Sequence, residues 1–307
     1  MKVSVNKIDE LDTLTGENDH LRIIVAPAAG GRILSIYNKK LDKEFLWKNK
    51  NLLLRCNEPG ADYDSNFWGG IDELIPNDIM ETIDGVQCPD HGELWTTKLD
   101  FEVNDGKMIL SGKLAQFGLG YKKTVSMNPD EPIMWLEYQI INESGRDRHF
   151  LWKLHAAMAI ENGDRLMTSA RRARIVDPEY SRFTSKEEFK WPIIENTNAS
   201  LVPEKNETMD FFYLYDINVG EMNFISADEQ SLFSYRYDQK IFPYQWYFAS
   251  YGKFLDHFTA ILEPCSSMPI SVNEAKPLGQ CSRLSPGQEL KTVVEIYAGR
   301  MINLIGR

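Results

Sequence analysis

The sequence of 307 residues has no long apolar run and no excess of positive charge. Nowhere do eighteen apolar residues follow one another, and the first ten residues lack the apolar core of a signal peptide. We therefore expect a soluble, cytoplasmic protein without a membrane partner. Lys and Arg number 34 against 45 Asp and Glu, which gives a net charge of −11. Binding along a nucleic-acid backbone requires clustered positive charge, so no nucleic-acid partner is expected.

Cysteine is also scarce, since the chain has only Cys56, Cys88, Cys265 and Cys281, far apart in the sequence. In the expected compartment such a set predicts free thiols and not a disulfide framework. No internal repeat, low-complexity tract or change in composition divides the chain. With 43% hydrophobic residues available for a core, we predict a single domain over residues 1–307.

Helical periodicity is nearly missing as well, and alternation with a period of two takes its place. This alternation predicts β-strands. Only residues 185–189 are typical of a short helix. Turn-forming clusters such as Asn142-Glu143-Ser144-Gly145 separate the segments. Many short strands without long helices indicate an all-β sandwich or barrel. The strands are expected at 21–26, 32–37, 107–114, 121–127, 134–141, 150–158, 221–226, 258–262 and 291–298.

Two of these segments bring titratable side chains to one strand face. Within residues 150–160, alternation places Lys153 and His155 together on the more polar face. Within residues 256–264, it places His257 and Glu263 on the same face, opposite the apolar side chains. A glutamate just before a strand-ending proline, here Pro264, can point into a cleft. Surface or hydrogen-bonded residues produce the same pattern, so position alone leaves both interpretations open.

Several segments, taken in order, resemble the aldose 1-epimerase (galactose mutarotase-like) family. The resemblance implies a very large antiparallel double-sheet sandwich and an isomerase of carbohydrate metabolism that interconverts the α and β anomers of a sugar without cofactor or metal. It also implies Glu263 as the catalytic base, His155 as the acid at the ring oxygen and His91 as a second donor to that oxygen. The matching segments are Gly30-Gly31-Arg32-Ile33-Leu34-Ser35-Ile36, Asp90-His91-Gly92-Glu93-Leu94-Trp95, Lys153-Leu154-His155, and Phe258 to Pro264 followed by Leu284-Ser285-Pro286-Gly287.

Residues near these motifs are candidates for holding the sugar. Flat aromatic faces can stack on the C–H face of a pyranose while neighbouring polar groups reach its hydroxyls. Core packing is the competing use of tryptophan. The substrate-binding candidates are Trp68, Glu73, Asn77, Trp95, Lys153, Gln245 and Trp246.

The chain also departs from the best-known galactose mutarotases. Ala156-Ala157-Met158 follows His155 where those enzymes continue with a Tyr-Phe-Asn type of sequence, and their Arg-rich motif before the first histidine has no counterpart. These differences leave open which sugar is bound and whether it is phosphorylated or acidic. Arg171, Arg172 and Arg174 could hold such an acidic group, although we favour a solvated loop.

Other interpretations remain. A non-catalytic carbohydrate-binding protein on the same fold is the main alternative, because fold does not imply function. A zinc deaminase would use His91-Gly92-Glu93 with Glu263-Pro264-Cys265, but Met268 stands where the second cysteine is needed. A β-sandwich associated with a sugar lyase or glycosidase would need a helical catalytic domain. The oligomeric state is left open.

Overall fold

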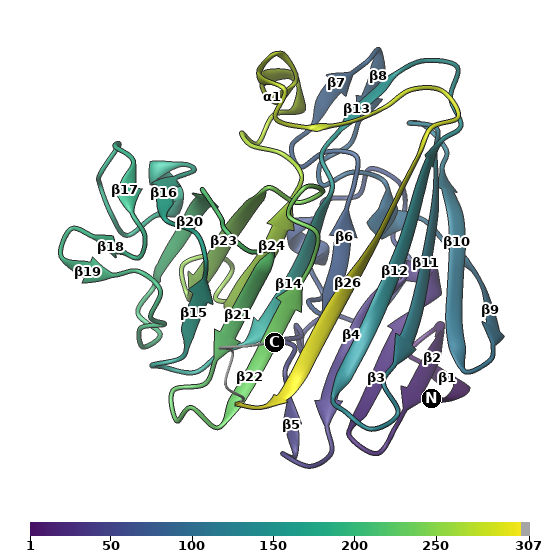
Figure 1. Cartoon of the computed structure of the whole chain (residues 1–307), viewed down its shortest axis with the longest axis horizontal. Coiled ribbons are helices and arrows are strands. Elements are labelled where there is room, and N and C mark those ends of the chain that lie inside the picture. Colours follow the sequence, from purple (N-terminus) through teal and green to yellow (C-terminus); the bar gives the residue numbers. More distant parts are fainter. Residues whose placement is uncertain (302–307) are drawn as a thin grey trace.

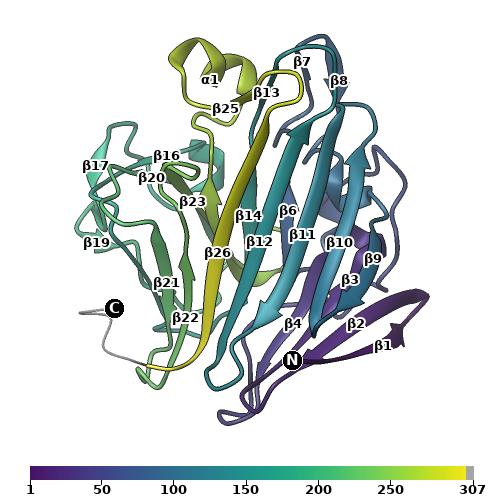
Figure 2. The ribbon, with the colours of Figure 1, turned by 45° about the vertical axis from the view of Figure 1, so that its right-hand side comes forward.

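The structure, a computed structural model, describes residues 1–301. Two large antiparallel sheets pack face to face, and the smaller one lies in front of β14 and β6 in Figure 2. The larger sheet has twelve strands, in the order β1 (Lys2–Ile8), β2 (Leu11–Glu17), β3 (Leu21–Ala26), β4 (Arg32–Asn38), β6 (Ile71–Leu74), β14 (Lys153–Ala159), β24 (Phe258–Cys265), β23 (Tyr244–Tyr251), β20 (Thr208–Tyr215), β16 (Arg172–Ile175) and β17 (Phe189–Lys190), with β5 (Lys43–Glu44) paired to β4.

The smaller sheet has eight strands, several of them long (Figure 1). Within residues 1–301, three short two-stranded sheets and one α-helix, α1 (Val272–Leu278), lie outside the two large sheets. The eight strands are β15 (Arg165–Thr168), β21 (Glu221–Ile225), β22 (Ser231–Arg236), β26 (Glu289–Arg300), β12 (Ile133–Asn142), β11 (Leu119–Met127), β10 (Lys107–Leu114) and β9 (Asp100–Asn104). Two of the small sheets are hairpins, β7 (Glu81–Ile83) with β8 (Val86–Cys88) and β18 (Ile193–Ile194) with β19 (Thr197–Asn198). The third pairs β13 (Arg148–Phe150) with β25 (Ser282–Leu284), which are far apart in the sequence. The 3₁₀ turns are η1 (Pro27–Ala29), η2 (Asp64–Asn66), η3 (Leu94–Thr96) and η4 (Pro178–Tyr180).

The all-β double-sheet sandwich confirms the predicted fold class. The alternating pattern located β3 and β10 at their observed bounds, and most other predicted strands differ from the observed ones by one or two residues at an end. The strand expected at 150–158 is wrong as one element, because the chain leaves β13 at Phe150 and begins β14 at Lys153. Between them, the N–H of Leu151 donates to the carbonyl of Pro76 and that of Trp152 to the Ser266 hydroxyl. These bonds move the chain from one sheet to another.

The helix expected at 185–189 is also wrong. The N–H groups of Thr184 and Ser185 donate to the carboxylate of Glu195 at 2.8 and 2.9 Å, which satisfies them without a helical turn. Helix α1 was missed, although its start carries a readable signal. Ser271 caps it by accepting from the N–H of Glu274, a serine followed three residues later by glutamate. Gly279 ends it in the left-handed conformation.

An apolar core fills the space between the two sheets, with one buried polar cluster inside it. The Nζ of Lys123, on β11, donates to Glu73 Oε1 on β6 at 2.9 Å and to the carbonyl of Gly31 at 2.7 Å. The hydroxyl of Tyr138 also donates to Glu73, at 2.5 Å. Each buried charge thus has several partners, which buried ionic groups require. The cluster ties β6 to the opposite sheet.

All four cysteines are free thiols, with Cys88 and Cys265 buried. No helix in residues 1–301 is long and apolar enough to cross a membrane.

Candidate active site

The site is built on the outer face of the larger sheet, where register brings three titratable residues into one row. His155 on β14 lies directly opposite Asp72 on β6. On its other side, the pairings Lys153 with Cys265 and Ala156 with Leu262 put His155 opposite Glu263 on β24. Side chains directly opposite one another in an antiparallel pair point to the same face, with Cβ atoms about 4.5–5.5 Å apart. Asp72, His155 and Glu263 therefore form a row across three neighbouring strands.

The carboxylate of Asp72 orients the imidazole of His155. His155 Nδ1 lies 3.0 Å from Asp72 Oδ1, while Asp72 Oδ2 accepts from Arg32 at 2.7 Å and from the Tyr63 hydroxyl at 3.0 Å. Burial opposes ionisation of Asp72, but the Arg32 guanidinium and the hydrogen bonds from His155 and Tyr63 outweigh it and hold its pKa well below the usual range. An ionised acceptor at Nδ1 keeps the proton on that nitrogen and leaves Nε2 facing the pocket.

Glu263 is paired with a lysine from the neighbouring strand. The Nζ of Lys153 lies 2.5 Å from Glu263 Oε2 and 2.6 Å from Asp78 Oδ1, and all three side chains are almost fully buried. Burial disfavours the charged lysine, but the carboxylates of Asp78 and Glu263 outweigh it and raise the pKa of Lys153 above its ordinary value. The lysine also lies over the ring of Trp246, 4.5 Å from its centroid. Glu263 Oε1 has no hydrogen-bond partner within residues 1–301.

His91 reaches the same space from the loop after β8. Its backbone has a positive φ of 57°, and its N–H donates to the carbonyl of Asp78 at 2.7 Å. Gly92 follows with φ 75°, and a Cβ there would lie 2.3 Å from the carbonyl oxygen of Ile75. Glycine is thus needed after His91, because the loop approaches the end of β6 closely.

The imidazole of His91 is held by its neighbours. It stacks on the ring of Tyr63 with centroids 4.0 Å apart, and its Nδ1 lies 2.7 Å from Asp90 Oδ2. Burial disfavours the cation, but the hydrogen bond to Asp90 and the charges of Asp78 and Asp90 prevail and raise the pKa of His91.

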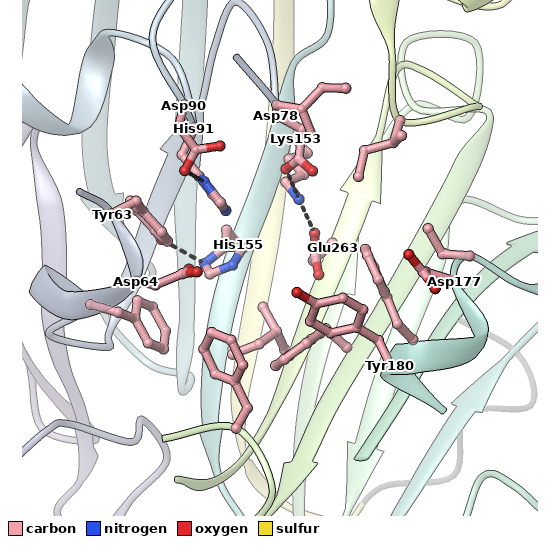
Figure 3. Close-up of a pocket in the computed structure, with 18 of the residues that line it drawn as sticks. Tyr63, Asp64, Asp78, Asp90, His91, Lys153, His155, Asp177, Tyr180 and Glu263 are labelled. Carbon is pink, nitrogen blue, oxygen red and sulfur yellow. Dashed lines mark hydrogen bonds and ion pairs between the residues drawn. The ribbon is translucent and has the colours of Figure 1, made fainter. Parts of the chain in front are cut away.

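A pocket of about 370 Å³ brings these groups together. Figure 3 shows His91, His155 and Glu263 around one space, with the Tyr180 ring reaching toward it from the far side. Next to the polar row, the register places Ile261 opposite both Ala157 and Phe248, which adds an apolar row to the floor. The size falls in the range of small-molecule sites. The remaining lining includes Phe67, Phe211, Phe254, His257 and Ile270.

Four of the predicted site residues line this pocket, namely Glu263, His155, His91 and Lys153. Two of the other candidates, Glu73 and Gln245, face the core between the sheets. Glu73 pairs with Lys123, and Gln245 donates to the carbonyl of Glu221 at 2.7 Å. Glu73 follows Asp72 and Gln245 precedes Trp246, and both of these neighbours lie on the outer face of the sheet. Because successive side chains of a strand point to opposite faces, Glu73 and Gln245 point into the core.

The remaining candidates support the pocket from behind or lie elsewhere. Asn77 donates to the carbonyls of Ile79 and Pro89, which ties the Asp78 loop to the His91 loop. Trp95 is buried edge-on against Tyr63, with centroids 5.1 Å apart, and Trp246 lies beneath Lys153. Trp68 lines a separate hollow together with Arg55 and Asn66.

Of the arginines considered for an acidic substituent, Arg172 and Arg174 lie on β16 near the sheet edge and Arg171 directly precedes this strand. Arg171 pairs with Asp216 at 2.8 Å and Arg172 with Glu188 at 3.1 Å, both exposed, while Arg174 lies over the ring of Tyr213. None of the three lines the pocket.

The deaminase motif is not assembled either. Glu93 accepts from the N–H groups of Gln116 and Phe117. In the described part of the chain, no three His, Cys, Asp or Glu side chains are arranged to hold a metal ion.

Sequence reasoning missed Tyr63, Asp72 and Asp78, as well as Asp177 and Tyr180 on the η4 turn. Asp72 and Asp78 flank residues that were singled out, in Asp72-Glu73 and Asn77-Asp78. The sequence signal that could have found Asp72 was the alternation in β6, which puts Asp72 and Glu73 on opposite faces. Alternation does not say which of the two faces carries the site.

The arrangement can transfer protons at two points of one bound molecule. Glu263 Oε1 and the Nε2 atoms of His155 and His91 border the pocket without a hydrogen-bond partner within residues 1–301. A carboxylate and an imidazole held on rigid strands, with partners that fix their orientation, are the components of general acid–base catalysis.

Comparison with known proteins identifies the fold. No protein-family model and no curated protein matches the sequence. Among solved structures, a galactose mutarotase-like protein from Clostridium acetobutylicum aligns with a TM-score of 0.73 at 14% identity, covering 98% of this chain and 99% of that one. A galactose mutarotase related enzyme from Lactobacillus acidophilus aligns with a TM-score of 0.66 at 14% identity, covering 95% and 98%. The Slr1438 protein from Synechocystis sp. PCC 6803 aligns with a TM-score of 0.72 at 13% identity, covering 97% and 99%.

Proposed function

We propose that this chain, which has the galactose mutarotase-like fold, is an isomerase of the aldose 1-epimerase type. It would interconvert the α and β anomers of an aldose by opening and closing the ring, with no cofactor. The observation that carries the proposal is the pairing of two free acid–base atoms in one pocket. Glu263 Oε1 and His155 Nε2 project from opposite positions on neighbouring strands and have no other partner in the described residues.

The reaction needs a base at the anomeric hydroxyl and an acid at the ring oxygen. Glu263 takes the proton of the anomeric hydroxyl as the C1–O1 bond becomes a carbonyl. His155, as an imidazolium whose charge Asp72 balances, gives its Nε2 proton to the ring oxygen as the bond from C1 to that oxygen breaks. Rotation about the C1–C2 bond then presents the other face of the carbonyl, and the two proton transfers run in reverse. Positioned acid–base groups of this kind contribute about 10²–10⁴-fold in rate.

His91 suits the role of a second donor to the ring oxygen. Its raised pKa extends the protonated form of the ring to higher pH, and Asp90 occupies Nδ1 so that Nε2 is available. Tyr63 stacks on His91 and donates to Asp72, so it positions both imidazoles. We assign Tyr63 and Asp72 as positioning residues.

The apolar row of the floor supports a sugar as the ligand. The C–H face of a pyranose can lie on Ile261 and Phe248 while its hydroxyls face the polar row. Lys153 is the substrate-binding candidate that lines the pocket, within reach of a hydroxyl beside Glu263.

One observation favours the alternative of a carbohydrate-binding protein without activity. Lys153 already pairs with Glu263 at 2.5 Å, so this carboxylate is engaged by an ammonium group before a sugar binds. Exchange NMR on a panel of aldoses distinguishes the two functions. An epimerase accelerates exchange between the α and β anomeric signals, whereas a binding protein broadens or shifts these signals without accelerating exchange. Absence of both effects over the whole panel would reject a sugar ligand.

A further inference from the structure

Carboxylates dominate the charged groups of the pocket. Asp64, Asp78, Asp90, Asp177 and Glu263 all line it, and Lys153 is the only lysine or arginine that does so in the described residues. The chain as a whole carries a net charge of −11. A cleft lined with one sign of charge concentrates the field of the molecule and attracts or repels a charged ligand accordingly.

The positively charged side chains at the site already pair with carboxylates. Lys153 lies between Asp78 and Glu263, and His91 pairs with Asp90 at 2.7 Å. Arg32 is buried behind the pocket on Asp72. Within residues 1–301, each lysine or arginine at the pocket already has a carboxylate partner, so none is left to receive a phosphate or a carboxylate of a sugar.

Two carboxylates of the lining have no cationic partner within residues 1–301. Asp64, on η2, makes no ion pair, and Asp177 only caps the η4 turn by accepting from the N–H of Glu179 at 2.9 Å. Desolvation raises the pKa of Asp64, with Asp90 adding to this effect and the charge of His91 opposing it. Uncompensated negative charge thus remains at the pocket.

The rest of the wall suits a cation. Phe67, Phe211, Phe248, Phe254 and Tyr180 line the pocket together with these carboxylates. The faces of aromatic rings attract ammonium groups. Aromatic rings also accept the C–H face of a neutral sugar, so neutral aldoses remain ligands.

We propose that this pocket selects aldoses by charge, binding amino sugars more tightly than neutral aldoses and excluding sugar phosphates and uronic acids. The inference rests on the proposed function in taking an aldose as the ligand. Selection by charge needs only binding, so it can be measured without turnover.

The test measures dissociation constants for four related sugars by titration calorimetry or ligand-observed NMR, slightly below neutral pH so that the amine is protonated. The sugars are galactose, galactosamine, galactose 6-phosphate and galacturonic acid, with the glucose series in parallel. Galactosamine should bind roughly three- to fivefold more tightly than galactose, as expected for one partly exposed ion pair. The two anions should bind about tenfold more weakly or worse, because they meet like charges.

Variants locate the effect. Asp177→Asn keeps the acceptor that caps the η4 turn and removes its charge, and should reduce the galactosamine-to-galactose preference toward one. Glu179→Gln is the matched control, because it removes the same charge from the same turn at a side chain that does not line the pocket. It should leave the preference unchanged. High salt should weaken the preference in the parent protein.

The outcomes separate this inference from the proposed activity. A phosphate or uronate that binds as tightly as the neutral sugar overturns the inference, as does galactosamine binding no better than galactose, or no binding of any sugar. If the charge order holds while anomer exchange stays at the uncatalysed rate, charge selection stands and the proposed isomerase activity fails.

Discussion

Replacing Glu263 with glutamine tests the proposed base most directly. The side chain is 1% exposed and lies on the pocket floor, where glutamine has nearly the same shape. The substitution removes the only group proposed to take the anomeric proton. Anomer exchange should therefore fall by two or more orders of magnitude, in the upper part of the range of about 10²–10⁴-fold for acid–base catalysis. Sugar binding should survive.

The cost in stability should be moderate. Glu263→Gln removes one partner of Lys153, but the lysine keeps Asp78 at 2.6 Å. Removing one member of a buried ion pair costs about 3–5 kcal/mol when the other charge is left alone. Because Lys153 is not left alone, we expect a smaller loss in the free energy of unfolding, and the variant should fold.

Exchange NMR under identical conditions gives the rate, and titration with the same sugar gives binding. Glu93→Gln is the matched control, because Glu93 is also a buried carboxylate but accepts from the N–H groups of Gln116 and Phe117 away from the pocket. It should lower stability and leave exchange nearly unchanged. If Glu263→Gln kept near-normal exchange, the base would lie elsewhere. His257, which lines the same pocket, would be the next residue to replace.

Three further predictions concern the groups around the base. His155→Asn should also slow exchange severely, and combining it with Glu263→Gln should cost little more than the worse single change, because both act in one proton transfer; additive losses measured in the double variant would contradict this. The pKa of His91 is raised in the folded protein, so the stability from its protonated form is complete below pH about 6.5 and is lost as the pH rises through the folded pKa. Asp90→Asn should move the NMR titration of His91 to lower pH, and an unmoved titration would exclude the role of Asp90. Lys123→Met leaves Glu73 buried without its cation and should lower the free energy of unfolding, measured in urea, by about 3–5 kcal/mol. Adding Glu73→Gln should restore part of this loss. A loss below about 1 kcal/mol would refute this account.

The fold class could be predicted from the sequence because strand alternation is local. A run such as Lys107–Leu114 shows in its own residues that one side is apolar, and the structure places β10 at those bounds. Breaks caused by distant partners could not be predicted in this way. The chain leaves one strand at Phe150 because Pro76 and Ser266 bind the next two N–H groups, and both partners are far away in the sequence.

The residues of the candidate site likewise fall into those that the sequence indicated and those that depended on distant contacts. The sequence singled out His91, His155 and Glu263 from their motifs, and it grouped Lys153 with His155 by alternation alone. It chose Glu73 in place of its neighbour Asp72, because a strand pattern with two buried faces does not reveal which face is the core.

The sequence by itself determined the alternating strands and the acid–base residues available to a site. Only the tertiary structure decided that Asp72 lies opposite His155, 83 positions later in the chain, and that Glu263 completes the row from β24. Register between strands so far apart depends on packing over the whole sheet, and a shift of one residue would turn each of these side chains to the other face.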